Sequence, residues 1–313
     1  MKKKVLKLAG LPAPLLSALQ EVYEVVEYST LSDSDFQQRA GEFDVVLTNG
    51  EGVVTRDQIA SLPALKLIAV FGVGYDGVDV QAALEHQVRV THTPDVLTED
   101  VADLAIGLML ATSRQIPAAQ AFIQQGKWSQ GSYPWTRKVS GASLGIVGMG
   151  RIGLAAAQRA QAFDMSIAYC NRSPVKDVAY RYQPDLVALA KECDFLVVCA
   201  PGTASNRHLI NREVMDALGS EGILINVGRG SVVDEQALIA ALDAGTLGGA
   251  GLDVFSEEPQ VPTALHNRPN VVLTPHMASA TWATRKAMSQ LVLDNVSAFF
   301  NGSPLVSPVP ESR

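Results

Sequence analysis

The chain has 313 residues, of which 47% are hydrophobic and 18% are charged, and its formal net charge is −7. This composition is that of an ordinary globular protein and excludes a disordered chain. Acidic and basic residues are interspersed, so the sequence predicts no basic face for nucleic acid, and no apolar run reaches the roughly 18 residues that a membrane helix requires.

The length exceeds that of one typical hydrophobic core and predicts two domains. The basic N-terminus is interpreted as the approach to a first strand rather than a signal peptide, because Lys7 and two prolines interrupt its apolar part. Cys170, Cys193 and Cys199 are an odd number of cysteines in apolar surroundings, which predicts buried free thiols in a reducing compartment. We therefore expect a cytoplasmic protein, and no Cys/His spacing predicts a metal site.

Short apolar runs alternate with helical patterns along the chain, which predicts parallel sheets covered by helices. The predicted strands form two series, Val5–Leu8, Val45–Leu47, Leu67–Val70 and Val88–Val90, then Leu144–Val147, Ile167–Cys170, Phe195–Cys199, Ile223–Val227, Ala250–Val254 and Val271–Leu273. A helix from Thr98 to about Ser113, with acidic residues in its first turn, is predicted to connect the two series.

A last helix is predicted after His276, because Met288, Leu291, Val292, Val296 and Phe299 recur at helical spacing. This helix is expected to return to the first series of strands. The predicted architecture is α/β with two doubly wound domains. A discontinuous, flavodoxin-like substrate domain covers residues 1–97 and 282–313, and a Rossmann-type NAD(P)-binding domain covers 98–281.

A glycine motif opens the second series of strands, with Gly148, Gly150 and Gly153 directly after an apolar run. Such a motif alone is weak evidence, since a tight strand–helix connection also uses glycines. Here a strand precedes it, and a helix and a second strand follow, which favours a dinucleotide site. The helix that begins near Arg151 would offer its N-terminal N–H groups to the pyrophosphate.

The second strand of that unit is followed by Asn171, at the position where NAD-binding proteins place an acid that holds the adenosine ribose. Asn171 does not repel a 2′-phosphate, while Arg172 and Ser173 supply a planar cation and a hydroxyl. This combination predicts NADP(H) rather than NAD(H). The alternative is that Arg172 is a solvated loop residue.

Four further strand ends are expected at the sheet edge where ligands bind in open parallel sheets, and three of them carry charged or titratable side chains. These strand ends carry Ala200-Pro201, Gly228-Arg229, Asp253 with Glu258, and His276. An arginine to hold a carboxylate, a histidine to give a proton and a carboxylate to orient the histidine suit the reduction of a 2-keto acid. Asp253 and Glu258 could each instead be a helix cap or a solvated loop residue. The remaining histidines are interpreted as ordinary surface or loop residues: His86, His92, His208 and His266.

With these residues, the chain resembles the D-isomer-specific 2-hydroxyacid dehydrogenases along nearly its full length. The resembling segments are VGYDGVD (73–79), TPDVLTEDVADLAIGLML (93–110), GIVGMGRIG (145–153), INVGRGSVVDE (225–235), GGAGLDVFSEEP (248–259) and LTPH (273–276). Within that family it resembles the glyoxylate/hydroxypyruvate and hydroxyphenylpyruvate reductases, which tend to carry an Arg-Ser pair where Arg172-Ser173 stand here.

The resemblance implies that Arg229 binds the substrate and that His276 is the general acid/base, with Glu258 as its partner. It implies that the backbone amides of Val73 and Gly74 hold the substrate carboxylate. The cofactor residues that it implies are Asp253, on the nicotinamide carboxamide, and Thr98, Arg151, Ile152, Ala200, Pro201, Val227 and Gly228 along the cleft. It also implies a homodimer through the cofactor domains and a cleft that closes over the substrate.

The favoured function is an NADPH-dependent reductase of a short 2-keto acid, such as glyoxylate, hydroxypyruvate or an aryl pyruvate, with weaker use of NAD(H). The alternatives are a phosphoglycerate dehydrogenase-type enzyme and a non-catalytic, NAD(P)-sensing protein of corepressor type. The small residues of the loop at 48–53 are expected to face the substrate. Trp135 is open to a substrate role or to packing in the core or an interface.

Overall fold

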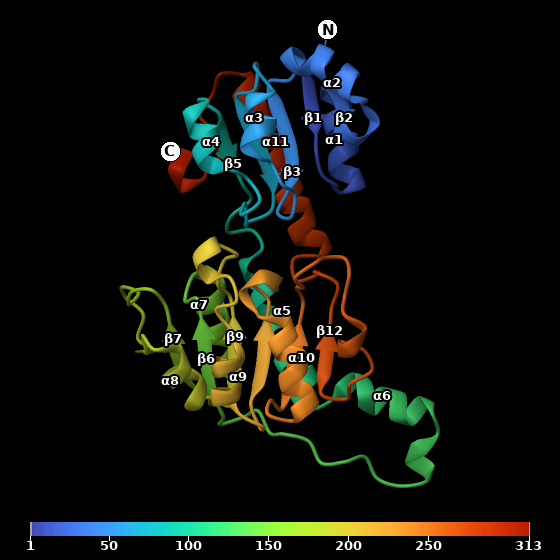
Figure 1. The fold of residues 1–313 in the computed structure, drawn as a ribbon, viewed down its shortest axis with the longest axis vertical. Coiled ribbons are helices and arrows are strands. Elements are labelled where there is room, and N and C mark those ends of the chain that lie inside the picture. The colour runs from blue at the N-terminus through green and yellow to red at the C-terminus, as the bar shows by residue number, and fades with distance from the viewer. Residues whose placement is uncertain (1, 313) are drawn as a thin grey trace. The chain divides into compact units, whose positions relative to one another are not determined.

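The structure is a computed structural model that describes residues 2–312, and it divides into two compact α/β units (Figure 1). Unit 1 consists of Met1–Leu97 with Thr281–Arg313, and unit 2 of Thr98–Ala280. The connecting helix begins unit 2 at Thr98, and the last helix belongs to unit 1.

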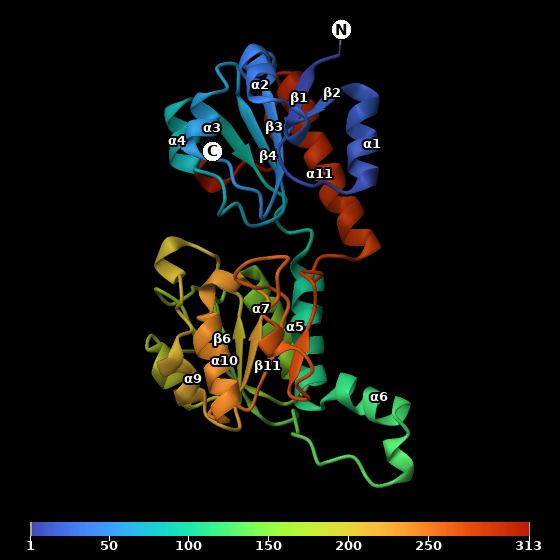
Figure 2. The same cartoon turned by 45° about the vertical axis from the view of Figure 1, so that its right-hand side comes forward.

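Unit 1 contains a five-stranded parallel sheet in the order β2-β1-β3-β4-β5, which is the flavodoxin-like order. Its strands are β1 (Lys4–Lys7), β2 (Glu24–Glu27), β3 (Val45–Asn49), β4 (Leu67–Phe71) and β5 (Arg89–Thr91). Its α-helices are α1 (Ala13–Val22), α2 (Asp33–Arg39), α3 (Arg56–Ala60), α4 (Val80–Glu85) and α11 (Trp282–Phe300). Helices α1 and α11 contact each other on one face of the sheet, and α3 and α4 contact each other on the opposite face (Figure 2).

Unit 2 contains a seven-stranded parallel sheet in the order β12-β11-β10-β9-β6-β7-β8, a Rossmann-type order with one additional strand. Its strands are β6 (Ser143–Val147), β7 (Ser166–Cys170), β8 (Arg181–Tyr182), β9 (Phe195–Val198), β10 (Ile223–Asn226), β11 (Gly249–Leu252) and β12 (Val271–Leu273). Its α-helices are α5 (Thr98–Ser113), α6 (Ile116–Gln124), α7 (Arg151–Gln161), α8 (Leu186–Lys191), α9 (Arg212–Leu218) and α10 (Glu235–Ala244).

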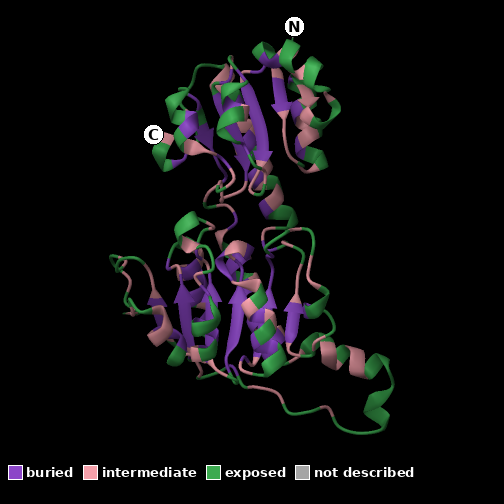
Figure 3. Cartoon of the chain, viewed as in Figure 1, coloured by how far each residue is buried: buried purple, intermediate pink, exposed green. Residues whose placement is uncertain are grey.

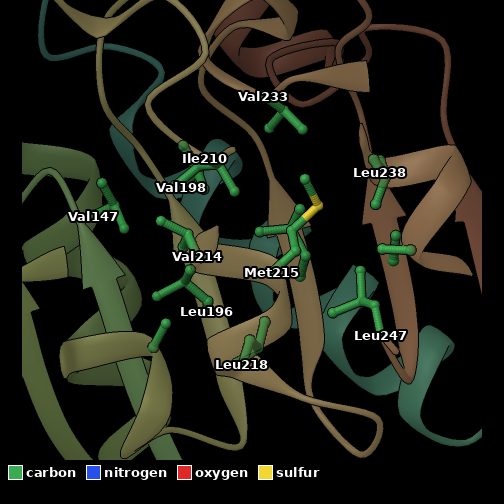
Figure 4. Close-up of a cluster of buried hydrophobic side chains, with 14 of the residues drawn as sticks. Val147, Leu196, Val198, Ile210, Val214, Met215, Leu218, Val233, Leu238 and Leu247 are labelled. Atoms are coloured by element: carbon green, nitrogen blue, oxygen red, sulfur yellow. The ribbon is translucent and has the colours of Figure 1, made fainter. Parts of the chain in front are cut away.

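The central strands of both sheets are buried on both faces (Figure 3), as expected where helices cover each side of a parallel sheet. In unit 2, α5 and α7 form one helix layer, and α8, α9 and α10 form the other. The core beneath the second layer contains Leu196, Val198, Val214, Met215 and Leu238 (Figure 4). This rigid core fixes the carboxyl ends of the strands, where the candidate site lies.

One segment of unit 2, residues 116–136, extends away from the sheet of that unit, and we call it the arm (Figure 1). The arm contains α6, and its large exposed hydrophobic side chains are Ile116, Ile123, Trp128 and Trp135. The chain returns to the sheet where the guanidinium of Arg137 pairs with the carboxylate of Asp194. Trp135 is therefore a surface residue of unit 2 and lies outside its core.

The predicted fold class is confirmed, and all ten predicted strands are present to within about two residues. The sequence interpretation missed β2 and β8, because β2 is a four-residue strand ending in exposed or half-buried glutamates and β8 has only two residues. The three cysteines are free but half-buried rather than buried, and burial raises the pKa of the Cys193 thiol to about 12. In residues 2–312, no helix is long and apolar enough to cross a membrane.

Candidate active site

The loops after β6 and β9 meet where the strand order of unit 2 reverses, the position at which doubly wound sheets bind ligands. Gly148 has φ +96°, and a Cβ atom there would lie 2.8 Å from the backbone nitrogen of Ala200. A Cβ atom at Gly153 would lie 2.3 Å from the carbonyl oxygen of Gly148. Close packing therefore requires both glycines. A Cβ atom at Gly150 would meet nothing within 4 Å, so the backbone is accessible on that side.

Helix α7 begins at Arg151, directly after this open glycine, and no side chain caps its N-terminus. The uncapped N–H groups and the helix dipole can attract an anionic group. The tight packing of Gly148 and the open side of Gly150 fit the pyrophosphate of a dinucleotide. Arg151 and Ile152, both predicted cofactor residues, lie in the first turn of this helix.

Asn171 has a structural contact that the sequence did not indicate. Its Oδ1 accepts a hydrogen bond of 2.7 Å from the backbone N–H of Met149, so it holds the glycine loop in place. The phenol of Tyr182 in turn donates to the carbonyl of Asn171 at 3.1 Å. Arg172 and Ser173 are exposed beside it, and neither forms a hydrogen bond or ion pair with another residue in the range 2–312. Both side chains can therefore turn to a ligand at this strand end.

The turn after β10 holds Arg229. Asn226 is 1% exposed, and its side chain binds the turn twice, donating to the carbonyl of Arg229 at 3.0 Å and accepting from the N–H of Gly228 at 3.1 Å. A Cβ atom at Gly230 would lie 1.9 Å from the carbonyl carbon of Phe255, so this turn packs directly on the loop that contains Glu258. Sequence reasoning missed Asn226, although a polar residue that ends an apolar strand was a usable signal.

Asp253 organises the loop that contains His276. Its carboxylate accepts hydrogen bonds from the N–H groups of Met277 (2.9 Å) and Ala278 (3.0 Å) and from the hydroxyl of Thr274 (2.6 Å). Its own carbonyl accepts from the N–H of His276 at 2.8 Å. These bonds hold His276 at φ +48°, a left-handed conformation that costs energy for a residue with a side chain. The role of Asp253 toward a nicotinamide remains a prediction.

Glu258 and His276 form a hydrogen-bonded pair. Oε2 of Glu258 lies 2.6 Å from Nδ1 of His276, and Oε1 accepts from the N–H of Phe255 at 2.8 Å. Burial alone would raise the pKa of Glu258, but the bonds from His276 and Phe255 and the charges of His276 and Arg229 lower it below its usual value. Glu258 is therefore ionised at neutral pH, Nδ1 of His276 donates to it, and Nε2 is the atom that can exchange a proton with a substrate.

The other predicted cofactor residues of unit 2 also lie near its strand ends and first helix. Thr98 begins α5, Ala200 and Pro201 follow β9, and Val227 and Gly228 follow β10. In unit 1, Val73 and Gly74 follow β4, and the loop at 48–53 comprises the end of β3 and the residues after it. The backbone N–H groups of Val73 and Gly74 donate no hydrogen bond to any described residue, so they are available to an anion.

One histidine differs from its interpretation as an ordinary surface or loop residue. His92 is 8% exposed, and its Nδ1 lies 2.9 Å from the carbonyl oxygen of Val73. The sequence could not reveal this contact, because it depends on how the chain between β4 and β5 folds back.

A Rossmann-type sheet, a glycine loop for a dinucleotide and a Glu–His pair beside an arginine define a nicotinamide-dependent oxidoreductase. Residues 106–278 match the family model of the D-isomer specific 2-hydroxyacid dehydrogenase NAD binding domain. The chain is 45% identical to glyoxylate/hydroxypyruvate reductase A of Arabidopsis thaliana and 46% identical to hydroxyphenylpyruvate reductase of Plectranthus scutellarioides, in each case over 97% of this chain and 98% of the relative.

A similar solved structure is the NADPH-dependent glyoxylate/hydroxypyruvate reductase of Sinorhizobium meliloti in complex with NADP and malonate. It is 43% identical, the match covers 100% of this chain and 98% of the other, and the TM-score is 0.92. The chain therefore belongs to the D-isomer-specific 2-hydroxyacid dehydrogenase family, whose members act on CH–OH groups.

Proposed function

We propose that the protein is an NADPH-dependent reductase that converts a short 2-keto acid into the D-2-hydroxy acid. The observation that supports this most directly is the Glu258–His276 pair beside Arg229, at the carboxyl edge of a dinucleotide-binding sheet. The named activities of the relatives agree with it: reduction of glyoxylate, hydroxypyruvate and hydroxyphenylpyruvate. The pair and Arg229 favour an enzyme over a non-catalytic NAD(P)-sensing protein.

Each residue has a defined part in this reaction. The Arg229 guanidinium binds the substrate carboxylate and polarises the carbonyl beside it. The protonated imidazole of His276 gives its Nε2 proton to the carbonyl oxygen as negative charge develops there. The ionised Glu258 stabilises the charged imidazole and fixes its orientation through Nδ1. NADPH supplies the hydride when it is bound, and the N–H groups of Val73 and Gly74 are the further groups proposed to bind the substrate carboxylate.

The choice of NADPH over NADH is attributed to Arg172, and Arg172→Ala tests it. A charge-assisted hydrogen bond contributes about 1.5–3 kcal/mol, so the variant should bind NADPH about 10- to 150-fold more weakly. NADH affinity should change little, and Asn171→Asp combined with Arg172→Ala should reverse the preference. The measurement is the dissociation constant of each cofactor by fluorescence titration.

The matched control for this prediction is Arg212→Ala, because Arg212 is an exposed arginine whose ion pair among residues 2–312 is with Asp216 on its own helix. This variant should bind both cofactors as the parent protein does. Equal losses of NADPH and NADH affinity in Arg172→Ala would show that Arg172 is a structural residue.

A homodimer through unit 2 is the proposed assembly, and the arm is its proposed contact. Exposed tryptophans and isoleucines on one projecting segment are typical of a protein interface. A pocket of the same segment, beside Tyr133 and Trp135, offers a recess for a side chain of the second copy.

The cytoplasmic location also remains a prediction.

The double variant Ile123→Glu/Trp135→Glu should convert the dimer into a monomer, because it places two charges in a desolvated contact. Sedimentation velocity measures this. Val22→Glu is the control, since Val22 is an exposed apolar residue of unit 1 and its replacement should leave the dimer intact. A dimer that persists in the double variant would place the contact elsewhere.

A further inference from the structure

We propose that His92 is a positioning residue that fixes the direction of the Gly74 N–H group and thereby the binding of the substrate carboxylate. The inference rests on the proposed function, in which that N–H group holds the carboxylate. It goes further by assigning a role to a histidine that lies in the chain after the binding loop and is not expected to touch the substrate.

The hydrogen bond between His92 and Val73 has a defined direction. Nδ1 of His92 lies 2.9 Å from the carbonyl oxygen of Val73. A carbonyl oxygen only accepts, so the hydrogen is on Nδ1 and the imidazole donates. This identifies the tautomer and shows that the bond also survives protonation of the ring.

The peptide group between Val73 and Gly74 transmits this constraint to the Gly74 N–H. The carbonyl of Val73 and the N–H of Gly74 belong to one planar peptide unit. Glu258-Pro259 is the cis bond of the described chain, so this unit is trans and the two groups point in opposite directions. A bond that holds the carbonyl on the side of His92 therefore points the Gly74 N–H to the other side.

The backbone at Gly74 needs an external bond to keep one direction. Glycine adopts a wide range of φ and ψ values at little cost, so the peptide unit before Gly74 could rotate if nothing held it. Neither Val73 nor Gly74 donates a backbone hydrogen bond to a described residue. The imidazole of His92 thus fixes an otherwise adaptable segment.

The position of His92 is in turn fixed by the C-terminal segment of unit 1. Its backbone N–H donates to the carbonyl of Ser307 at 3.2 Å, and the hydroxyl of Ser307 donates to its carbonyl at 2.6 Å. Its ring packs edge-to-face on Tyr75, with the centroids 5.2 Å apart, and the phenol of Tyr75 donates to Glu311 at 3.2 Å. The ring therefore has one defined place from which to reach Val73.

Two substitutions separate the hydrogen bond from the packing of the ring. His92→Phe keeps an aromatic ring against Tyr75 but cannot donate, whereas His92→Asn loses the ring but places an amide N–H close to the position of Nδ1. At saturating NADPH, we expect His92→Phe to raise the KM for glyoxylate or hydroxypyruvate about tenfold, as loss of one hydrogen bond to a bound carboxylate would. Its kcat and its dissociation constant for NADPH should stay within about twofold of the parent values.

His92→Asn should recover most of the lost affinity, with a KM within about threefold of the parent value. His92→Leu is a second variant without a donor and should resemble His92→Phe, which covers the case in which one of them folds poorly. His86→Phe is the matched control, because His86 also places Nδ1 2.9 Å from a backbone carbonyl, that of Ala82 on α4. Its KM should equal that of the parent.

The opposite order, with His92→Asn impaired and His92→Phe normal, would show that the ring only packs against Tyr75 and would overturn the inference. A parallel loss of kcat, substrate affinity and thermal stability in every His92 variant would also overturn it, because a structural role produces that pattern. If the parent enzyme reduces no 2-keto acid, the proposed function and this inference fail together. If the parent reduces it and His92→Phe keeps the parent KM, only this inference fails.

Discussion

His276→Ala should lower kcat/KM for 2-keto acid reduction by about 100-fold or more, which is the contribution of a positioned general acid. The imidazole is the proton donor of the proposed reaction, and its Nδ1 lies 2.6 Å from Glu258. Steady-state rates across pH measure the effect. The residual activity of the variant should also lose the pH dependence that the parent shows. A variant that keeps a pH-dependent rate near that of the parent would place the proton donor elsewhere.

Glu258→Gln tests the same pair through pH. Reduction requires the protonated imidazole, so kcat/KM for reduction falls as the pH rises. The pKa of Glu258 is lowered, so its carboxylate is charged over the working range and stabilises the protonated His276. The amide keeps the size of the side chain but removes the charge, and the descending limb of the profile should move to lower pH. In the oxidation direction the neutral imidazole is required, and the ascending limb should move to lower pH as well.

The control for this shift is Glu257→Gln, which changes an exposed acid at the neighbouring position and should leave both limbs in place. Limbs that stay in place in Glu258→Gln while the rate merely drops would show that Glu258 orients the imidazole without stabilising its charged form.

Arg229→Lys is the second substitution with a large expected effect, a fall of about 100-fold in kcat/KM. Lysine keeps the positive charge but not the planar fork that binds a carboxylate through two hydrogen bonds, each of which contributes about 1.5–3 kcal/mol. The variant would also lose the hydrogen bond of 2.9 Å from Nη1 of Arg229 to the carbonyl of Gly228. This bond fixes the direction of the guanidinium. The dissociation constant for NADPH should remain close to that of the parent.

Arg207→Lys is the control, because Arg207 is an exposed arginine of unit 2 with no ion pair among the residues that the structure describes. Turnover by Arg229→Lys within a few-fold of the parent rate would remove Arg229 from the proposed mechanism.

The sequence predicts most of this architecture because buried parallel strands appear as short apolar runs between glycine, proline and polar residues. The strands β2 and β8 lack that signal, since they lie at sheet edges and their residues are half-buried or exposed rather than buried. The glycine motif is likewise predictable, because its glycines follow an apolar run at a fixed spacing. The contact that requires Gly153 is local, with Gly148, whereas the one that requires Gly148 is with Ala200, which is remote in sequence.

The hydrogen bonds that hold the loops around the predicted site are harder to predict from the sequence. Asn171 binds the glycine loop through Met149, Asp253 binds the loop of His276, and His92 binds Val73. In each case a polar side chain at a strand end can bind either a ligand or a distant backbone group, and the residue type fits both. The distinction depends on how loops that are remote in sequence approach one another, which a local pattern does not encode.

The central claim is that this chain reduces 2-keto acids with NADPH by proton donation from His276. The most direct test is the rate of NADPH and NADH oxidation by the parent protein and by His276→Ala, with glyoxylate, hydroxypyruvate and hydroxyphenylpyruvate as substrates. We expect the parent to oxidise NADPH with at least one of these acids and to prefer NADPH to NADH, and we expect His276→Ala to lose about 100-fold or more of the rate. A parent rate no higher than that of His276→Ala with every acid and both cofactors would contradict this mechanism.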